Sequence, residues 1–369
     1  MKKSNSSEQK KPLLKRIDNY LLQFSRVPLK EKLFFLQYFA IMIRAGLSLS
    51  VIMKTLARQT SHKRLKKILE EVGGNVEKGH SLTDSFKPHE DVFGELFINM
   101  IEAGENSGNL EGVLYQLYDQ MKKKHALISQ IRNALTYPAF IILVMIIVGV
   151  MMMVKVVPQL VSMLERFDTE LPLATRLLID ISDFMSSNIL FLLMFSTAMI
   201  VLLVYTYRTR RGKYIFQYML LKTPVVKSIM IKINLARFSR TMSGLLKSDI
   251  LVTRSFRITA NVLNNLVYRE AVSEMGRKVE KGYQINTLIP KYPSLFPPVV
   301  HEVVSVGEKT GELDGMLLEL AEHYEEEVKN VMKNLPSIIE PVLIVLLGVV
   351  IGGMAMAIIL PMYSLTSTI

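Results

Sequence analysis

Apolar residues follow two patterns along this chain. In residues 31–59, EKLFFLQYFAIMIRAGLSLSVIMKTLARQ, they recur every three or four positions with polar residues between them, which predicts amphipathic helices. Residues 133–154, 184–207 and 341–363 are instead apolar or uncharged throughout. Each of these stretches reaches the roughly 20 residues that a helix needs to cross a bilayer. The pattern predicts an all-α membrane protein with three transmembrane helices.

The chain also repeats itself at an offset of 203 residues. IEAGENSGNLEGVL at 101–114 returns as VSVGEKTGELDGML at 304–317, and VEKG at 76–79 returns at 279–282. Upstream of VEKG we expect the offset to slip by about two residues. No stretch alternates polar and apolar residues as a strand does. The sequence therefore predicts two homologous antiparallel helical bundles, each followed by an apolar helix, as parallel repeats.

The distribution of charge predicts on which side of the membrane each segment lies. Residues 1–136 carry a net charge of +8 and residues 208–336 a net charge of +7, whereas residues 156–183 carry −3. Because Lys and Arg accumulate on the cytoplasmic side, we expect both bundles and the N-terminus in the cytoplasm and the C-terminus outside. The expected segments are a basic cytoplasmic tail (1–30), bundle 1 (31–136), a transmembrane helix (137–160), an extracytoplasmic loop (161–183), a second transmembrane helix (184–207), bundle 2 (208–338), a third transmembrane helix (339–362) and an extracytoplasmic end (363–369).

Few residue patterns suggest chemistry. The sequence has no Cys, and its six His residues show no ligand spacing. It contains no G-x-x-x-x-G-K-[S/T] phosphate loop and no suggestive Ser, His and Asp grouping. Its basic stretches lack interleaved aromatic residues, so lipid accounts for them better than nucleic acid does. We therefore expect no enzyme activity, no cofactor and no direct nucleic-acid binding.

The repeated glycine-rich stretch predicts a tight turn between two helices. Gly104 and Gly108 bracket the turn, where a positive φ or a close backbone approach excludes a Cβ. Glu105 lies just before the next helix, whose free N–H groups it can bind, and Leu110 anchors that helix in the core. The alternative for Glu105 is a cation site shared with Glu111 or Asp119. Before this turn, DSFKPHEDVFG at 84–94 predicts a loop.

Several stretches of both copies closely resemble the F-family inner-membrane platform proteins of type II secretion, type IV pili and competence pseudopili. In the first copy they are IMIRAGLSL, VEKGHSLTDSF, MIEAGENSGNL and ALTYPAF, and in the second copy they are VEKGY, VVSVGEKTGEL and IIEPVL. The resemblance covers roughly residues 30–362. The family's motif residues fall on Gly46, Gly79, Gly104, Glu105, Gly108, Leu110, Tyr137, Pro138, Gly282, Gly307, Glu308, Gly311, Leu313, Glu340 and Pro341. One departure is LLKSDIL, where Ser248 and Asp249 must close a turn that is usually formed by glycine.

This resemblance implies a non-enzymatic, homo-oligomeric scaffold in the bacterial inner membrane. Such a platform contacts a hexameric cytoplasmic assembly ATPase and other inner-membrane components of its machine, and it helps pilin or pseudopilin subunits into a filament. The first bundle and the tail are expected to face the ATPase. The alternative from another class is a transporter or channel built on parallel repeats, which would need polar residues within the spans.

Two further hypotheses concern charge. The repeat places Lys122, Lys123 and Lys124 on the positions of Glu325, Glu326 and Glu327. Either these runs pair, so that reversing both would restore assembly lost by reversing one, or each is a solvated helix face. Glu340, at the mouth of the third span, either pairs with Lys333 or contacts the N-terminus of a prepilin. The prolines Pro138 and Pro341 fit helix starts or kinks.

Overall fold

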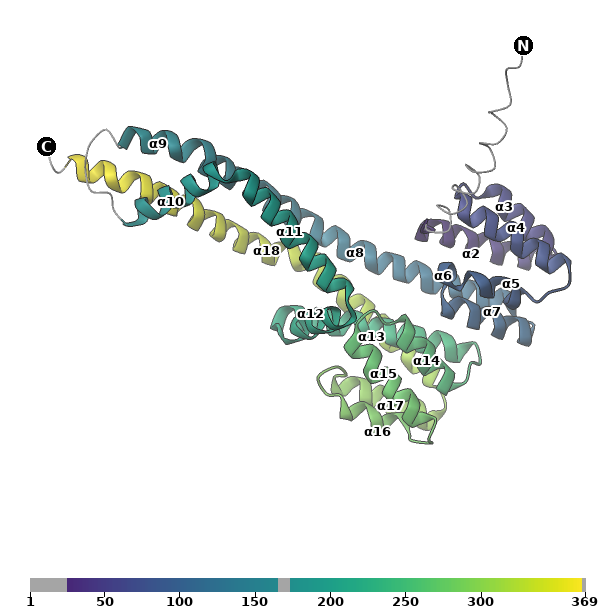
Figure 1. The fold of residues 1–369 in the computed structure, drawn as a ribbon. Coiled ribbons are helices and arrows are strands. Elements are labelled where there is room, and N and C mark those ends of the chain that lie inside the picture. Colours follow the sequence, from purple (N-terminus) through teal and green to yellow (C-terminus); the bar gives the residue numbers. More distant parts are fainter. Residues whose placement is uncertain (1–24, 165–172, 367–369) are drawn as a thin grey trace, which may run out of the picture. The chain divides into compact units, whose positions relative to one another are not determined.

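The computed structural model describes residues 25–164 and 173–366, and all regular structure in these residues is helical (Figure 1). The chain divides into two compact units. The first consists of the residues up to Leu127 together with Leu221–Glu326, and it contains both bundles. The second consists of Ile128–Leu220 and the chain from Glu327. The predicted all-α class is confirmed, with two repeated bundles and three helices long and apolar enough to cross a membrane.

Bundle 1 consists of short helices joined by tight turns. They are α2 (Leu29–Arg44), α3 (Leu49–Gln59), α4 (Lys63–Glu77), α5 (Leu82–Phe86), α6 (Glu90–Phe93), α7 (Glu95–Ser107) and the beginning of α8 (Leu110–Met151). Residues 84–94 are therefore not the loop that the sequence predicted. They form α5, a 3-10 turn at Lys87–His89 and α6, because Phe86 and Phe93 are buried and hold the segment against the core.

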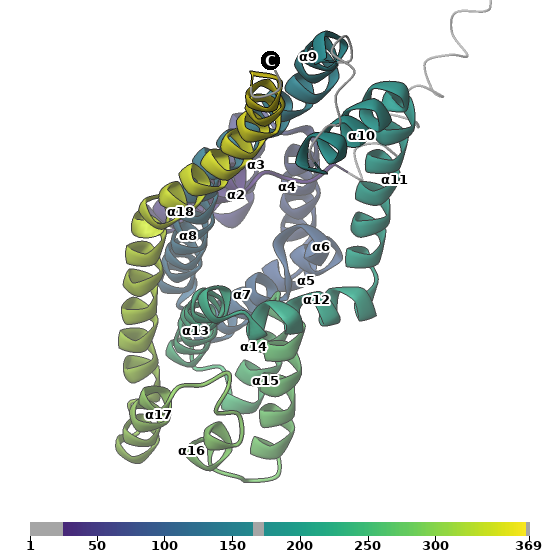
Figure 2. The ribbon, with the colours of Figure 1, turned by 90° about the vertical axis from the view of Figure 1, so that its left-hand side faces the viewer.

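Bundle 2 repeats this order. It contains α13 (Pro224–Lys247), α14 (Val252–Val262), α15 (Leu266–Val279), α16 (Ile285–Leu288), a 3-10 turn at Ile289–Lys291, α17 (Pro298–Thr310) and the beginning of α18 (Leu313–Thr366), and α12 (Arg210–Lys222) precedes it. Figure 2 shows α14 and α15 side by side, as α3 and α4 are in bundle 1.

The offset of 203 residues holds through the first helices, so the predicted slip upstream of VEKG is wrong. Asp249 occupies the position of Gly46, and both have positive φ, 57° and 77°. The N–H of Ile250 bonds to the carbonyl of Leu245 at 3.1 Å, as the N–H of Leu47 bonds to that of Met42 at 3.2 Å. Asp tolerates the left-handed conformation better than most residues. The turn is therefore kept while its glycine is lost.

Each bundle has an aromatic core. In bundle 1, the rings of Phe35, Phe86, Phe93 and Phe97 lie 4.6 to 6.3 Å apart between centroids. In bundle 2, Phe238, Phe256, Tyr268 and Phe296 are buried together. Three apolar side chains of the second copy, Leu245, Ile250 and Ile258, belong to the core of bundle 1. The two bundles thus share a hydrophobic junction.

The second unit contains the apolar helices. These are the later parts of α8 and α18, a π-helical segment (Met152–Val156), α9 (Val157–Leu164), α10 (Leu173–Ser187) and α11 (Ile189–Arg208). The Ser182 hydroxyl, on α10, donates to the carbonyl of Met153 at 2.6 Å. Hardly any side chain in the most apolar windows of the three spans is buried within the chain, as expected for helices that face lipid.

Some predicted boundaries differ from these helices. The second apolar helix begins at Ile189 rather than at residue 184, because the chain turns at Asn188 after α10. The expected extracytoplasmic loop, 161–183, contains the end of α9 and much of α10, while its residues 165–172 lie outside the described residues. Most of the expected tail, residues 1–24, and the last residues of the expected end, 367–369, also lie outside them.

Candidate functional site

The repeated glutamate binds the start of a helix in each bundle. In bundle 1, Glu105 Oε1 accepts a hydrogen bond from the N–H of Leu82 at 2.7 Å, and Oε2 accepts from the N–H of Thr83 at 3.0 Å and from its hydroxyl at 2.7 Å. In bundle 2, Glu308 accepts from the N–H groups of Ile285 and Asn286 at 2.8 and 3.0 Å. These N–H groups open α5 and α16, and they have no partner within their own helix.

This arrangement corrects the predicted target of Glu105. The sequence placed Glu105 in a turn before α8, but α7 continues to Ser107 and ends at Gly108. Glu105 is therefore in the last turn of α7, and its carboxylate points across the bundle to α5. The interaction ties together two segments that lie 22 and 23 residues apart. A carboxylate at a helix N-terminus is also favoured by the helix dipole.

The motif glycines fall into two groups. Gly79, Gly108, Gly282 and Gly311, like Gly46, have φ between 69° and 87°, which a side chain rarely allows. Gly104 and Gly307 are instead inside helices, where the next helix passes close by. A Cβ on Gly104 would lie 3.1 Å from Val113 Cβ, and one on Gly307 would lie 2.9 Å from Leu313 Cα. Leu110 and Leu313 pack at the edges of the two cores.

The alternative cation site is not assembled. Both oxygens of Glu105 are engaged by α5. Glu111 and Asp119 are on α8, where eight residues span about 12 Å along the axis. Nowhere in the described part of the chain do three or more His, Asp or Glu side chains form a group suited to a metal ion.

The two bundles meet along α7 and α8 of bundle 1 and α13 and α14 of bundle 2. Gln116 Nε2 donates to the carbonyl of Gly244 at 2.6 Å, and its Oε1 accepts from the hydroxyl of Ser248 at 2.8 Å. Arg254 forms an ion pair with Glu102, and Asn261 Nδ2 donates to Glu95 Oε2 at 2.7 Å. α7 contacts α14 directly (Figure 2). The junction is therefore both hydrophobic and hydrogen-bonded.

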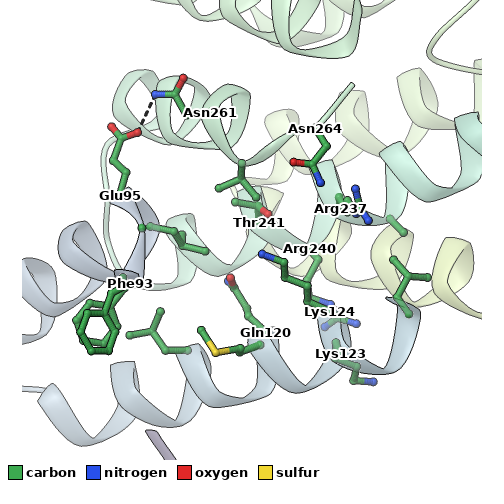
Figure 3. Close-up of a pocket in the computed structure, with 18 of the residues that line it drawn as sticks. Phe93, Glu95, Gln120, Lys123, Lys124, Arg237, Arg240, Thr241, Asn261 and Asn264 are labelled. Carbon is green, nitrogen blue, oxygen red and sulfur yellow. Dashed lines mark hydrogen bonds between the residues drawn. The ribbon is translucent and has the colours of Figure 1, made fainter. Parts of the chain in front are cut away.

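A cleft of about 320 Å³ opens at this junction (Figure 3). Its lining comes from both bundles and includes Phe93, Glu95, Gln120, Lys123, Lys124, Arg237, Arg240, Thr241, Asn261 and Glu325. Four of these side chains are basic and two are acidic. Figure 3 shows the dashed hydrogen bond from Asn261 to Glu95 at one end and the basic side chains toward the other. Basic side chains therefore outnumber acidic ones in the lining of the cleft.

The carboxylate of Glu325 is the main acidic partner of the basic side chains in the cleft. Glu325 accepts two hydrogen bonds from Arg240, at 2.9 Å from Nε and 2.7 Å from Nη2. Burial opposes the positive charge of Arg240, but the Glu325 carboxylate, together with the nearby Asp119 and Glu322, more than offsets this and raises the pKa of the guanidinium. Burial lowers the pKa of Lys124, and the nearby Arg237 lowers the pKa of this ammonium further. Arg237 Nε is itself buried without a hydrogen-bond partner.

A contact between the two opposite charge runs lies in this region. Lys123 Nζ lies 3.8 Å from Glu325 Oε2, which is longer than the bonds from Arg240 to the same carboxylate. Lys122 lies over the ring of Tyr118, 5.9 Å from its centroid, and Lys124 lines the cleft. Lys123 is therefore a secondary partner of Glu325, behind Arg240.

The motif residues at the mouths of the spans are in helix interiors. Pro138 lies within α8 and Pro341 within α18, so neither begins a helix as a helix-start proline would. Tyr137 is 47% exposed. Glu340 is exposed on α18, and in the described residues no ion pair joins it to Lys333. Its predicted contact with a prepilin stays a prediction.

The junction residues were not predicted from the sequence, although the two copies differ at several of their positions. At matching positions, the first copy has Phe34, Tyr38 and Val51 where the second has Arg237, Thr241 and Arg254. At these three positions of one face, the large side chains of the first copy correspond to polar ones in the second, while both cores are apolar. A comparison of the copies at the right offset would have indicated that this face has different neighbours in the two bundles.

Comparison with known proteins gives the same repeat. The family model for the type II secretion system (T2SS), protein F, matches twice, at residues 35–158 and 238–361. The chain is 33% identical over 341 residues to the type IV pilus assembly protein PilC of Thermus thermophilus, covering 92% of this chain and 84% of that protein. It is 30% identical over 333 residues to the type II secretion system protein F of Aeromonas hydrophila, covering 89% and 85%.

Proposed function

This chain belongs to the type II secretion system protein F family, and we propose that it is the inner-membrane assembly platform of a type IV pilus, type II secretion or competence machine. The observation that carries the proposal is the doubled unit, in which a bundle continues without a break into an apolar helix. The family model covers both copies in full register. The relatives are named for assembly of a pilus or for secretion, and they align along most of the chain.

We propose that the platform couples a hexameric cytoplasmic ATPase to the insertion of pilin-like subunits into a filament. The sequence has no phosphate loop of its own, so the energy would come from the partner. α8 runs from the bundle 1 core to Met151, and α18 runs from the bundle 2 core to Thr366. A displacement of either bundle would therefore move an apolar helix to which it is covalently continuous. The protein acts in this scheme as a mechanical scaffold rather than as an enzyme.

The proposed location is the inner membrane, with the N-terminus and both bundles in the cytoplasm and the C-terminus outside. The excess of Lys and Arg in the two bundle segments supports this orientation. We retain the proposed order of tail, bundle, span, loop, span, bundle and span, with the second span taken as Ile189–Arg208. Other inner-membrane components, the lipid bilayer and further copies of the chain complete the proposed set of partners.

The test is to crosslink cells that produce the tagged full-length chain, purify it in mild detergent and identify its partners by mass spectrometry. Cells with the untagged chain provide the background. Enrichment of an assembly ATPase with a phosphate loop, together with a prepilin, is the expected result, and it would also name the machine. A preparation that lacks both and transports a small solute in liposomes would instead favour the transporter.

A further inference from the structure

One face of bundle 1 exposes large apolar side chains. In residues 25–127, the exposed large hydrophobic residues are all on α2 and α3 or the turn between them, and each has 37 to 48% of its surface exposed: Phe34, Tyr38, Ile41, Leu47 and Val51. Five such side chains on two consecutive helices form a contiguous patch rather than scattered surface residues. We call this patch the α2–α3 face.

All five positions have a counterpart in bundle 2 that faces bundle 1. At the offset of 203 residues the counterparts are Arg237, Thr241, Gly244, Ile250 and Arg254. The carbonyl of Gly244 accepts from Gln116, and Arg254 pairs with Glu102. Ile250 belongs to the core of bundle 1, and the other two line the cleft at the junction. Among the described residues, the same face of the fold is thus covered in copy 2 and exposed in copy 1.

The surface that covers this face also has an uncovered counterpart. In bundle 1 it consists of α7 and the beginning of α8, where Leu96 and Ala103 pack against the shared core. Their counterparts on α17 of bundle 2 are Val299 and Val306, which are 46% and 50% exposed. We call the surface on α17 and the beginning of α18 the α17–α18 face. Each chain therefore has both halves of a second junction, one on each bundle.

The helices that carry the two exposed faces also differ in charge. Besides the apolar residues of the face, α2 and α3 contain Lys30, Arg44 and Arg58 against the single acidic Glu31, whereas Lys32 donates to the carbonyl of Val92 and Lys54 pairs with Glu77. Residues 313–326 of α18 contain no Lys or Arg, and they include the acidic Asp314 and Glu319 besides Glu322 and Glu325, which pair with Arg240 of the same chain. In the junction within the chain, the ion pair between α14 and α7 likewise has its basic member, Arg254, on α14 and its acidic member, Glu102, on α7. Opposite potentials favour and orient association.

We propose that the α2–α3 face of one chain packs on the α17–α18 face of a second copy of this chain, repeating between chains the junction that α13–α14 and α7–α8 form within one chain. The contact is head-to-tail, because its two halves are different surfaces. Two chains that exchange it about a two-fold axis would close a ring of four bundles. The proposal is argued from the repeat and its exposed faces, and it deepens the proposed function by specifying how two copies of the chain would meet.

The absence of native cysteine makes the contact testable in the full-length chain in membranes. Within one chain, Arg254→Cys with Glu102→Cys should be joined by a short bismaleimide, since the two residues form an ion pair. The equivalent positions between chains are Val51 and Ser305. Two differently tagged chains, one with Val51→Cys and the other with Ser305→Cys, are therefore produced together. We expect a crosslinked dimer that carries both tags.

The matched control replaces Val51→Cys by Lys67→Cys, at an exposed position on α4 away from the α2–α3 face. We expect the Val51 pair to give at least about tenfold more dimer than the Lys67 pair. Adding Ile41→Glu to the Val51→Cys chain should reduce the dimer to the control level, because it places a carboxylate opposite the acidic α18, whereas adding Lys67→Glu should not reduce it.

Two results would overturn the proposal. The first is equal yields from the Val51 and Lys67 pairs while the pair within the chain crosslinks fully. The second is capture of Val51→Cys by a cysteine at Leu13 of its own chain in place of the partner, since the N-terminal segment would then occupy the face. Loss of the ATPase from the purified complex bears on the proposed function alone and leaves this contact to be judged by the crosslinks.

Discussion

Glu105 and Glu308 occupy equivalent positions and do the same work in the two bundles. Each holds the first two N–H groups of a short helix, α5 or α16, against the end of a longer one. Bundle 1 adds the hydroxyl of Thr83, where bundle 2 has Asn286. A carboxylate is suited to this position because it offers two oxygens to two donors that would otherwise be left unsatisfied.

Replacing Glu105→Gln should therefore loosen α5. The amide has one acceptor oxygen, and its NH₂ group would face a backbone donor, so we expect a loss of about 1–3 kcal/mol in the local free energy of opening. Hydrogen exchange at Leu82 and Thr83 in the full-length chain measures this loss directly. Glu70→Gln, on the exposed side of α4, is the control. Unchanged exchange at α5 would mean that the carboxylate is dispensable there.

The helical glycines make a second prediction. Gly307→Ala would place a Cβ 2.9 Å from Leu313 Cα, so α17 and α18 must separate slightly, and we expect a loss of about 1–3 kcal/mol in stability. Gly315→Ala, on α18, meets nothing within 4 Å and should stabilise the helix by up to about 1 kcal/mol. Thermal unfolding followed by circular dichroism would rank the two variants against the parent chain. The reverse order would contradict the close approach.

His89 gives the chain a predicted pH dependence. Burial lowers the pKa of its imidazole below the ordinary value of 6.5, although Glu71 Oε2 at 3.6 Å and the nearby Asp91 oppose this and Arg64 reinforces it. The unfolded chain then binds this proton at a higher pH than the folded chain does. Stability should consequently fall as the pH drops below 6.5 toward the lower pKa of the folded state.

The check is the midpoint of thermal unfolding across this pH range, for the parent chain and for His89→Gln. The variant should show a shallower decline on the acid side, because it removes one group that is protonated preferentially on unfolding. His323→Gln, at an exposed position on α18, is the matched control. A decline of equal slope in all three chains would assign the effect to other groups.

At the scale of helices, the sequence predicted most of what depends on local pattern. The 3.6-residue period, the apolar stretches and the glycine turns indicated the helices, the spans and the duplication. The target of Glu105 depends on a contact across 23 residues, and no local pattern indicates where α7 ends relative to α5. The slip in the offset was expected because the second copy has Asp249 where the first has Gly46. The two residues differ in type, but both have positive φ and close the same turn.

The junction was harder to predict because it depends on where the copies differ. Gly244 lies so close to α8 that a Cβ would fall 1.7 Å from Gln120 Nε2. The equivalent residue of copy 1 is Ile41, which is exposed. Residues that are the same in both copies indicate the fold that the two bundles share. Residues that differ at equivalent positions indicate that the two bundles have different neighbours there. The cleft and its Arg240–Glu325 pair lie where the copies differ, so only a comparison of the two copies could have indicated them.

The structure changes the expected result of the charge reversal. Reversing Lys123→Glu alone should cost little, about 0–1 kcal/mol, because the pair is long and partly exposed. Reversing Glu325→Lys should cost more, about 1.5–3 kcal/mol, since Arg240 loses a two-bond partner and faces a new cation. The double reversal should not restore stability, because Arg240 is still present. Full rescue in chemical unfolding would show that Lys123 and not Arg240 is the main partner.

At the scale of the whole molecule, the duplication explains why the described residues contain an odd number of candidate spans. In the proposed arrangement, each bundle precedes its apolar helix on the same side of the membrane, and α11 returns the chain for the second copy. If the basic bundle segments are retained in the cytoplasm, the acidic stretch 156–183 is the part that crosses. The family membership, the two copies and the three candidate spans are then all consistent with the proposed orientation, in which both bundles are cytoplasmic.

Single cysteines in the cysteine-free chain test this arrangement. Lys67→Cys in bundle 1 and Arg257→Cys in bundle 2 are at exposed positions, as is Asp180→Cys on α10. In cells with a permeabilised outer barrier and an intact inner membrane, an impermeant maleimide should label only Asp180→Cys. After lysis it should label all three, which confirms that each thiol is accessible. Labelling of either bundle before lysis would reverse the proposed orientation, and with it any role that requires both bundles to meet a cytoplasmic ATPase.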